Sequence, residues 1–266
     1  MLNNNFIFDN YKRSDYISST IVALFYTKKN NDFLNKSLEN PLSIYIQKFI
    51  QINFIEKLKN GVSINYKVIK DFLKIIINNN YYIKKDNNIF SFYKYLSNIF
   101  LINYIEYKNT NLIDDIDKNK NLISIIDLDI NDKIDNTISL KDLIDNWLLN
   151  KCNNNLDVKK ILNIPELIAL KINRNNRSID ININKKICIF NYTRQYDLEK
   201  LRWNILSIIC QDSISNNYYS VLIINEKWYL FNDMEIPCFK EISMSNNLIT
   251  NKIKKECLLL FYRLNK

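Results

Sequence analysis

The N-terminal part of the chain carries apolar side chains at the spacing of an α-helix. Between Tyr16 and Thr27, the residues Ile17, Ile21, Ala23 and Leu24 fall on one helical face. The same periodicity continues in segments that are each long enough for several helical turns. These segments, which we predict to be helices, are residues 42–58, 66–77 and 90–107.

The pattern changes after a polar and acidic segment, residues 109–120, which we interpret as a loop. A run rich in β-branched residues follows at 122–130, and a helical pattern at 138–150. Short apolar runs bounded by turn residues then predict strands at 167–173, 186–189, 205–210, 218–225, 227–231 and 257–263. Helices followed by antiparallel strands indicate an α+β fold. We predict one domain over residues 1–266, with a helical lobe at 1–120 and a β-rich lobe at 121–266.

Composition adds a constraint on the turns. The chain has one Gly and three Pro in 266 residues, and Asn, Ile, Lys and Tyr dominate it, a bias typical of an AT-rich genome such as that of a virus, plasmid or parasite. Because Gly is nearly absent, turns that need a positive φ are expected to use Asn or Asp. Residues 78–80 and 153–155, two runs of Asn, are predicted turns.

The net charge of +9 raises the question of nucleic-acid binding. The Lys residues are spread along the chain and interleaved with Asp and Glu, and no basic helix or zinc-finger pattern is present. We therefore interpret the charge as solvated surface and expect no nucleic-acid partner. A basic nucleic-acid-associated protein stays as a third alternative.

Metal and redox chemistry are limited by the ligands available. The five cysteines lack a CxxC pair and the chain has no His, so we expect no metal site and no cofactor. An odd number of widely spaced cysteines fits a reducing cytoplasmic setting, that of the host if the source is viral, with the nucleus as an alternative. The first ten residues lack a secretory pattern, and no apolar run is long enough to span a bilayer, so no membrane association is expected.

Several segments occur in an order known from one family. The segment NNYYSVLIINEKWYLFND, residues 216–233, resembles the hairpin that carries the catalytic histidine in ubiquitin-specific proteases. IPELIALKINR at 164–174, the block at 186–210 and CLLLFYRL at 257–264 resemble strands of the same family. At the front, SDYISSTIVALF, residues 14–25, resembles the box that contains the nucleophilic cysteine. The resemblance implies a papain-like fold with a helical thumb and a β-rich antiparallel palm. Members of the family often carry zinc-binding fingers with two CxxC pairs, and because this chain has no such pair, we expect the zinc fingers to be absent or metal-free.

The resemblance also assigns the four catalytic positions of the family to residues of this chain. The oxyanion position falls on Asn10, the nucleophile position on Asp15, the base position on Tyr218 and the third position on Asn232. Asn10 and Asn232 are of residue types that could serve at their positions. The nucleophilic cysteine and the basic histidine, however, are both replaced, by Asp15 and Tyr218. A Cys–His dyad cannot form in a chain without His, because a phenol with a reference pKa near ~10 does not accept a proton at neutral pH.

Each of these positions also has an ordinary structural interpretation. Asp15 would cap the N-terminus of its helix, where a carboxylate is favoured. Tyr218 would be an aromatic residue of an exposed hairpin. Tyr219, Trp228 and Asp233 are candidate binding residues beside the base position, although Trp228 is more typical of a palm core.

The sequence thus predicts a pseudoenzyme with the fold of a deubiquitinase. Its expected partner is ubiquitin, a ubiquitin-like modifier or another protein. The alternative is a structural or scaffold protein of an AT-rich virus or plasmid that uses the fold as an assembly surface without binding ubiquitin. An active hydrolase is not expected.

Overall fold

A computed structural model describes residues 7–9, 11, 14–27, 31–79, 88–102, 104–111, 120–130, 136–152, 155–174, 179–190 and 200–265. The chain divides into two compact units. Unit 1 comprises residues 1–102 and 207–249, and unit 2 comprises residues 103–206 and 250–266. The strand β10 (Trp203–Gln211) and the helix α8 (Asn247–Glu256) each carry the chain from one unit into the other.

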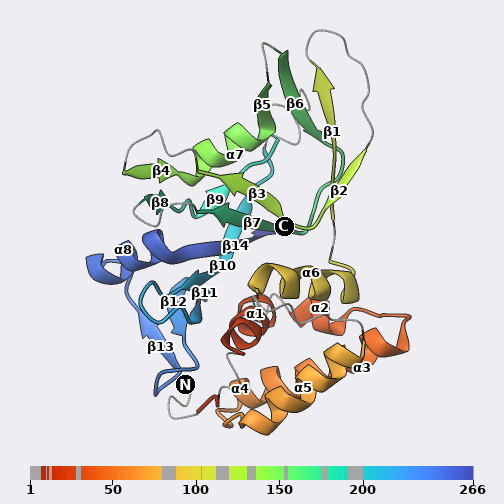
Figure 1. The fold of residues 1–266 in the computed structure, drawn as a ribbon, viewed down its shortest axis with the longest axis vertical. Coiled ribbons are helices and arrows are strands. Elements are labelled where there is room, and N and C mark those ends of the chain that lie inside the picture. Colours follow the sequence, from red (N-terminus) through yellow and green to blue (C-terminus); the bar gives the residue numbers. More distant parts are fainter. Residues whose placement is uncertain are drawn as a thin grey trace. The chain divides into compact units, whose positions relative to one another are not determined.

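Helices form the first part of unit 1 (Figure 1). The sequence periodicity predicted most of them, and their N-termini are capped as the residue types suggest. Asn40, Asn65 and Asn88 each accept a hydrogen bond from a backbone N–H in the first turn of the helix that follows. These helices and their bounds are α1 (Asp15–Phe25), α2 (Asn31–Asn35), α3 (Pro41–Ile50), a π-helical segment (Gln51–Glu56), α4 (Lys57–Lys59), α5 (Tyr66–Asn78) and α6 (Ile89–Ile99).

The sheet of unit 1 contains β13 (Phe239–Ile242), β12 (Lys227–Phe231), β11 (Tyr218–Ile224) and the end of β10, neighbours in this order and all antiparallel. Asn216 and Asn225, which lie in the turns between these strands, have φ values of 59° and 50°. The expectation that Asn takes the positive-φ positions is confirmed at these two turns. Glu226 and Leu101 also have positive φ, which the sequence did not suggest.

Unit 2 contains a four-stranded antiparallel sheet in the order β2, β1, β6, β5. These strands are β1 (Ile105–Asn111), β2 (Asn121–Ile123), β5 (Leu149–Cys152) and β6 (Asn155–Ile161). The helix α7 (Leu140–Leu148) contacts this sheet at β5 and β6. Trp147 of α7 stacks edge-on against Tyr107 of β1, with ring centroids 5.5 Å apart, and the Lys159 ammonium of β6 lies 5.0 Å from the Trp147 ring.

Three further strands of unit 2 are neighbours in a second sheet, in the order β14, β7, β3 (Figure 1). They are β14 (Cys257–Leu264), β7 (Leu167–Asn173) and β3 (Ile126–Asp129), and β9 (Lys186–Ile187) pairs with the start of β10. β3 runs parallel to β7, and β4 (Thr137–Ser139) runs parallel to β8 (Asp180–Asn182). The antiparallel prediction therefore holds for most pairs and fails for these two.

Three predicted elements were wrong in extent or type. The helix predicted at 90–107 ends at Ile99, and β1 begins at Ile105. The β-branched run at 122–130 is split between two sheets, because β2 pairs with β1 and β3 pairs with β7. The helix predicted at 138–150 is shorter, since β4 and β5 take its ends. β1, β3 and β4 pair with segments about 40 to 50 residues away, which local periodicity does not register, whereas β5 forms a hairpin with β6, the next strand in the chain.

Two predicted turns and the predicted loop lie partly outside the described residues. Asn78 ends α5 and Asn155 begins β6, while residues 80, 153 and 154 are not described. Of the loop predicted at 109–120, residues 109–111 belong to β1 and residues 112–119 are not described. In the part of the chain that the structure describes, no helix is long and apolar enough to cross a membrane.

Candidate functional site

The candidate site in unit 1 is built around α1, which is buried on every face. All eleven residues from Asp15 to Phe25 are buried, and the helix contacts β11. A helix surrounded by protein must satisfy its polar groups internally, so each polar side chain on α1 needs a partner. The hydrogen-bond partners of the polar residues of α1 therefore identify the other residues of the site.

Asp15 is the first residue of α1, which agrees with the predicted position, but the N-cap residue is Ser14 and its side chain makes no capping hydrogen bond. One of its carboxylate oxygens, Oδ2, accepts a hydrogen bond from the backbone N–H of Tyr218, with 2.6 Å between the nitrogen and oxygen. Tyr218 is the first residue of β11 and is half-buried. The two positions assigned to the nucleophile and the base are thus 203 residues apart in sequence and hydrogen-bonded to each other.

Two serines of the sheet fix the rest of α1. The Ser220 hydroxyl donates to the carbonyl oxygen of Ser19, and the Ser207 hydroxyl donates to that of Ala23, both at 2.8 Å. Together with Asp15, the helix is bonded to the sheet at intervals of one turn, four residues apart. This spacing holds the N-terminus of α1 in a fixed position against the start of β11.

The Ser18 hydroxyl links α1 to the end of the hairpin. Ser18 Oγ lies 2.5 Å from Oδ2 of Asp233 and 3.0 Å from the carbonyl oxygen of Asp15. Ser220 pairs with Phe231, so continuing the register by two residues places Asp233 opposite Tyr218. Asp233 thus approaches the first turn of α1 from the return strand of the hairpin.

Burial controls the ionisation of this cluster. The pKa of Asp233 is raised from 3.8 to about 7, mainly by burial and also by the nearby Asp15 carboxylate, while the Ser18 hydrogen bond opposes the rise. Oδ1 of Asp233 is buried without a hydrogen-bond partner among the described residues, as suits a neutral carboxyl group better than a carboxylate. A protonated Asp233 would donate to Ser18 Oγ, and the single Ser18 proton could then go to the Asp15 carbonyl.

Cys238 is a further member of this region. Burial raises the pKa of its thiol to about 12, and the neighbouring Asp233 adds to the effect. The thiol is therefore protonated at neutral pH and is a poor nucleophile. Sequence reasoning missed Ser18 and Cys238. Ser18 was detectable in principle, because it lies one turn after Asp15, whereas Cys238 carries no local signal.

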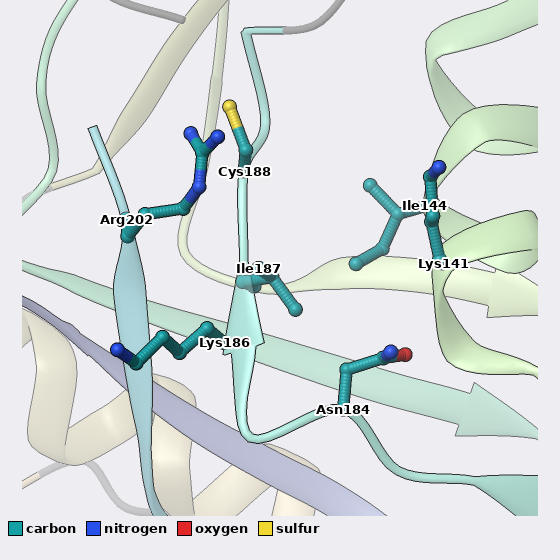
Figure 2. A pocket seen from close by; sticks show the side chains of 7 residues that line it. All are labelled: Lys141, Ile144, Asn184, Lys186, Ile187, Cys188 and Arg202. Carbon is teal, nitrogen blue, oxygen red and sulfur yellow. The ribbon is translucent and has the colours of Figure 1, made fainter. Parts of the chain in front are cut away.

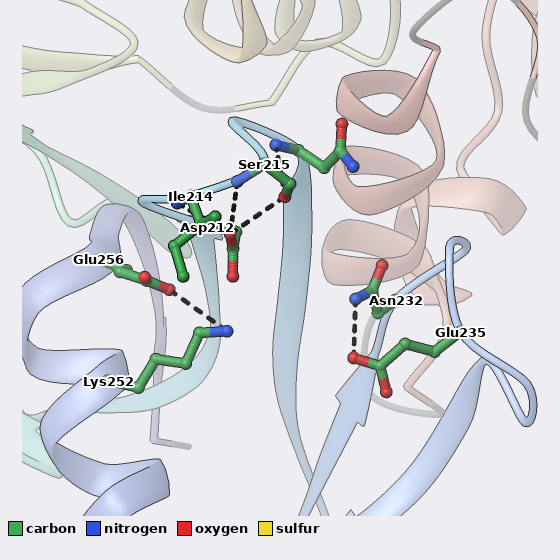
Figure 3. Close-up of polar contacts among 8 residues, drawn as sticks. Asp212, Ile214, Ser215, Asn232, Glu235, Lys252 and Glu256 are labelled. Carbon is green, nitrogen blue, oxygen red and sulfur yellow. Dashed lines mark hydrogen bonds and ion pairs between the residues drawn. The ribbon is translucent and has the colours of Figure 1, made fainter.

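Asn232, assigned to the third catalytic position, bonds within its own turn. Its amide nitrogen donates to Oε1 of Glu235 at 3.0 Å (Figure 3). Its amide oxygen accepts from the backbone N–H of Met234 at 3.1 Å. The side chain that contacts α1 is therefore that of Asp233. The catalytic role of Asn232 rests on the alignment and stays a prediction.

The turn before Tyr218 is organised by Asp212. Its carboxylate accepts hydrogen bonds from the backbone N–H groups of Ile214 and Ser215 and from the Ser215 hydroxyl, at 2.8 to 3.0 Å (Figure 3). Ile214 at the tip is 92% exposed. This ordered turn sets the direction in which β11 leaves Tyr218.

The remaining predicted site residues have different environments. Tyr219 is buried, Trp228 is half-buried in β12, and Asp233 is buried at the end of the hairpin. Their predicted binding roles stay predictions, although the burial of Tyr219 leaves little surface for a partner. Asn10, the predicted oxyanion residue, lies outside the described residues. Among the residues that the structure describes, no group of three or more His, Cys, Asp and Glu side chains could hold a metal ion.

Comparison with known proteins identifies the fold. No protein-family model and no curated protein sequence matches the chain. Among the solved structures that it resembles are several of the SAGA deubiquitinase module that contains Ubp8. The match to the yeast module with a mutant Sgf73 has a TM-score of 0.62 and 14% identity, covering 98% of this chain and 68% of the other.

Two further structures of the same module match this chain to a similar extent. The Ubp8, Sgf11, Sus1 and Sgf73 module matches with a TM-score of 0.64 at 14% identity, covering 98% of this chain and 67% of the other. The module bound to monoubiquitin matches with a TM-score of 0.62 at 14% identity, covering 98% and 69%. The chain therefore has a fold of the ubiquitin-specific-protease type, combining helices and sheets as the sequence predicted.

Proposed function

We propose that this protein is a catalytically inactive relative of the ubiquitin-specific proteases that acts by binding ubiquitin, a ubiquitin-like modifier or a protein that carries one. The observation that supports this most is the hydrogen bond between the Asp15 carboxylate and the Tyr218 backbone N–H. In the assigned alignment, it joins the nucleophile position to the base position. A buried carboxylate bonded in this way closes the space in which an acyl group would react.

The chemistry of the available side chains supports inactivity. The chain has no His, and a phenol with a reference pKa near ~10 is a poor general base at neutral pH. The cysteines at 210, 238 and 257 are buried. Burial raises the pKa of Cys257, in addition to that of Cys238, so these two thiols are held in the unreactive form.

In chain order, the four-stranded sheet of unit 2 follows the helices of unit 1 and precedes β7. We propose that it is a metal-free version of the fingers of the family, one of the two alternatives that the lack of CxxC pairs left open. Packing among Trp147, Tyr107 and Lys159 would supply the stability that zinc supplies elsewhere. Such a sheet would keep part of a ubiquitin-binding surface.

Binding to ubiquitin tests the proposal directly. Titration of isotopically labelled ubiquitin with the full chain should shift a contiguous set of ubiquitin resonances, with a Kd tighter than about 1 mM. A ubiquitin variant with its surface residues mutated serves as the negative control. The absence of shifts at millimolar protein would reject the binding role and favour the scaffold alternative.

A thiol-reactive ubiquitin probe tests inactivity separately. The unmodified protein should not be labelled. The double variant Asp15→Cys, Tyr218→His should react faster than Asp15→Cys alone, because a helix N-terminus and an imidazolium both favour thiolate. Labelling of the unmodified protein that disappears in Cys188→Ala or Cys210→Ala would mean that the nucleophile has been misassigned.

A further inference from the structure

The helix α5 in unit 1 carries exposed apolar side chains in addition to those that attach it to the core. Its buried residues are Ile69, Phe72 and Ile76. Tyr66 and Ile77 are 54% and 47% exposed, and Leu73 is half-buried. The Tyr66 ring stacks on that of Tyr11, with ring centroids 6.3 Å apart. With 3.6 residues per turn, positions 66, 73 and 77 fall within about 40° of one another, so the three side chains form one row along the helix.

A row of cations lies beside this apolar row. Lys67, Lys70 and Lys74 follow one another at the spacing i, i+3 and i+7, and all three are exposed. Lys74 pairs with Asp71 at 3.5 Å, whereas Lys67 and Lys70 have no hydrogen-bond or ion-pair partner among the described residues. We call the two rows together the outer face of α5. Because its lysines outnumber its acidic residue, this face is both apolar and positively charged.

We propose that the outer face of α5 binds a helix of a partner protein that carries a row of aliphatic side chains beside a row of Glu or Asp. Helices pack on one another through rows of side chains, and the aliphatic row of the partner would cover Tyr66, Leu73 and Ile77. Its carboxylates would lie beside Lys67 and Lys70 and supply the negative charge that these lysines lack within the described residues. The proposal goes beyond ubiquitin binding and does not depend on it.

Three other occupants are less complementary to this face. A second copy of the chain in a two-fold dimer would bring lysines close to lysines, which repel one another. A single-stranded nucleic acid stacks its bases on aromatic rings, whereas Leu73 and Ile77 are aliphatic and the Tyr66 ring already stacks on Tyr11. A membrane would need a broad apolar surface that can enter the lipid, but α5 is held by its buried side and its exposed apolar row is narrow.

A fluorescein-labelled helical peptide, made of three Glu-Leu-Ala-Ala-Leu-Glu-Ala repeats, tests the proposal by fluorescence anisotropy with the full chain. It should bind more tightly than the same peptide with Gln in place of every Leu, a change that keeps the helix propensity and the charge. Binding should weaken as salt is raised, because the paired charges are exposed. Equal binding of the two peptides would overturn the proposal, since the apolar row would then have no role.

Two double variants with the same change of charge test the cations. Lys67→Glu, Lys70→Glu alters the outer face of α5 and should weaken binding of the Leu peptide at least about tenfold. Both lysines are exposed and Glu is a good helix former, so α5 should still form. The control Lys141→Glu, Lys186→Glu lies in unit 2, where both side chains line a small pocket (Figure 2), and should change the affinity less than about twofold. Equal losses in the two double variants would indicate non-specific attraction and overturn the proposal.

A single variant tests the apolar row without changing the charge. Ile77→Gln should weaken binding of the Leu peptide at least about fivefold, because it removes exposed aliphatic surface from the row. Ile52→Gln is the matched control, at an isoleucine of the π-helical segment that is 54% exposed, and should change the affinity less than about twofold. Circular dichroism verifies that both variants are folded. An unchanged affinity in a folded Ile77→Gln variant would reject the outer face of α5 as the binding surface.

Two further measurements would reveal a different occupant. Self-association of the unmodified chain in analytical ultracentrifugation, if Ile77→Gln abolishes it, would assign the face to a second copy. Binding to phosphatidylserine vesicles or to a thymidine oligonucleotide that is tighter than to the Leu peptide, and that is lost in Lys67→Glu, Lys70→Glu, would assign it to a polyanion. Either result would overturn the proposed partner helix, and the absence of both is expected.

Discussion

At the scale of single residues, the site depends on a few buried polar atoms whose partners lie far away in the sequence. Asp15 bonds to the Tyr218 backbone, and Asp233 reaches Ser18 from the other end of the hairpin. A buried carboxyl group that lacks a cationic partner is costly when charged, so its proton becomes part of the structure. This makes Asp233 the residue through which pH should act on stability.

Burial should make the protein less stable as pH rises through the range in which Asp233 loses its proton. Its pKa is raised from 3.8 to about 7, so between these values the folded state holds a proton that the unfolded chain has released. The free energy of unfolding should therefore fall between about pH 4 and 7 and level off above. From pH 5 to 7.5, we expect this contribution to be on the order of 2 to 3 kcal/mol.

Urea unfolding at pH 5 and pH 7.5 measures this effect. The Asp233→Asn variant keeps a hydrogen-bonding side chain near Ser18 and Cys238 but has no titrating group, so its stability should lose most of this pH dependence. The other carboxyl groups are present in both proteins and cancel in the comparison, except for Asp15, whose charge interacts with that of Asp233. Equal pH dependence in the two proteins would mean that Asp233 is already ionised in the folded state at pH 5.

At the scale of elements, one aromatic side chain joins α7 to the four-stranded sheet of unit 2. Trp147 of α7 contacts Tyr107 edge-on and lies under the Lys159 ammonium, which also donates to the Trp147 carbonyl at 2.6 Å. These contacts connect the helix to β1 and β6, two strands that are paired with each other. The indole thus holds together elements that are separate in sequence.

Removing the indole should loosen this sheet selectively. Trp147→Ala deletes a half-buried aromatic side chain and should lower the free energy of unfolding by about 2 kcal/mol. Hydrogen exchange should accelerate in β1 and β6, while amides of α1 and β11 in unit 1 keep their protection. Trp147→Phe, which keeps an aromatic ring, should be intermediate. Uniform acceleration in both units would contradict a local role for Trp147.

At the scale of the whole molecule, the possible metal ligands bear on stability. The described residues contain no group of three or more metal-binding side chains, and the chain has no His. A structural zinc site couples metal binding to folding. We therefore predict that the stability of this protein does not depend on a bound metal ion.

Chelation should consequently leave the protein intact. Dialysis against EDTA should not change the Tm, and elemental analysis of the purified protein should find less than about one zinc per ten chains. A known structural zinc protein treated in parallel verifies that the chelator works. A fall in Tm after chelation would show that the fingers-like sheet holds a metal through residues that we have not assigned.

Local sequence patterns were sufficient to locate elements that are stabilised by interactions with neighbouring residues in the chain. Helical periodicity located α5, and the turn residues at both ends located β12, which pairs with its chain neighbours β11 and β13, at its observed bounds. The absence of His and the Asp at position 15 were also readable without a structure. These features depend on short-range interactions or on composition alone.

Tertiary structure decided the rest, because the interactions involved join residues that are far apart in the chain. β1 was mistaken for the end of a helix, since its partner β6 lies about 50 residues away and propensity alone does not register it. The same reason applies to Asp233, whose raised pKa arises from burial beside Ser18 and Asp15. Sequence determined which chemical groups are present, and the packing of distant segments determined which of them are buried, paired and charged.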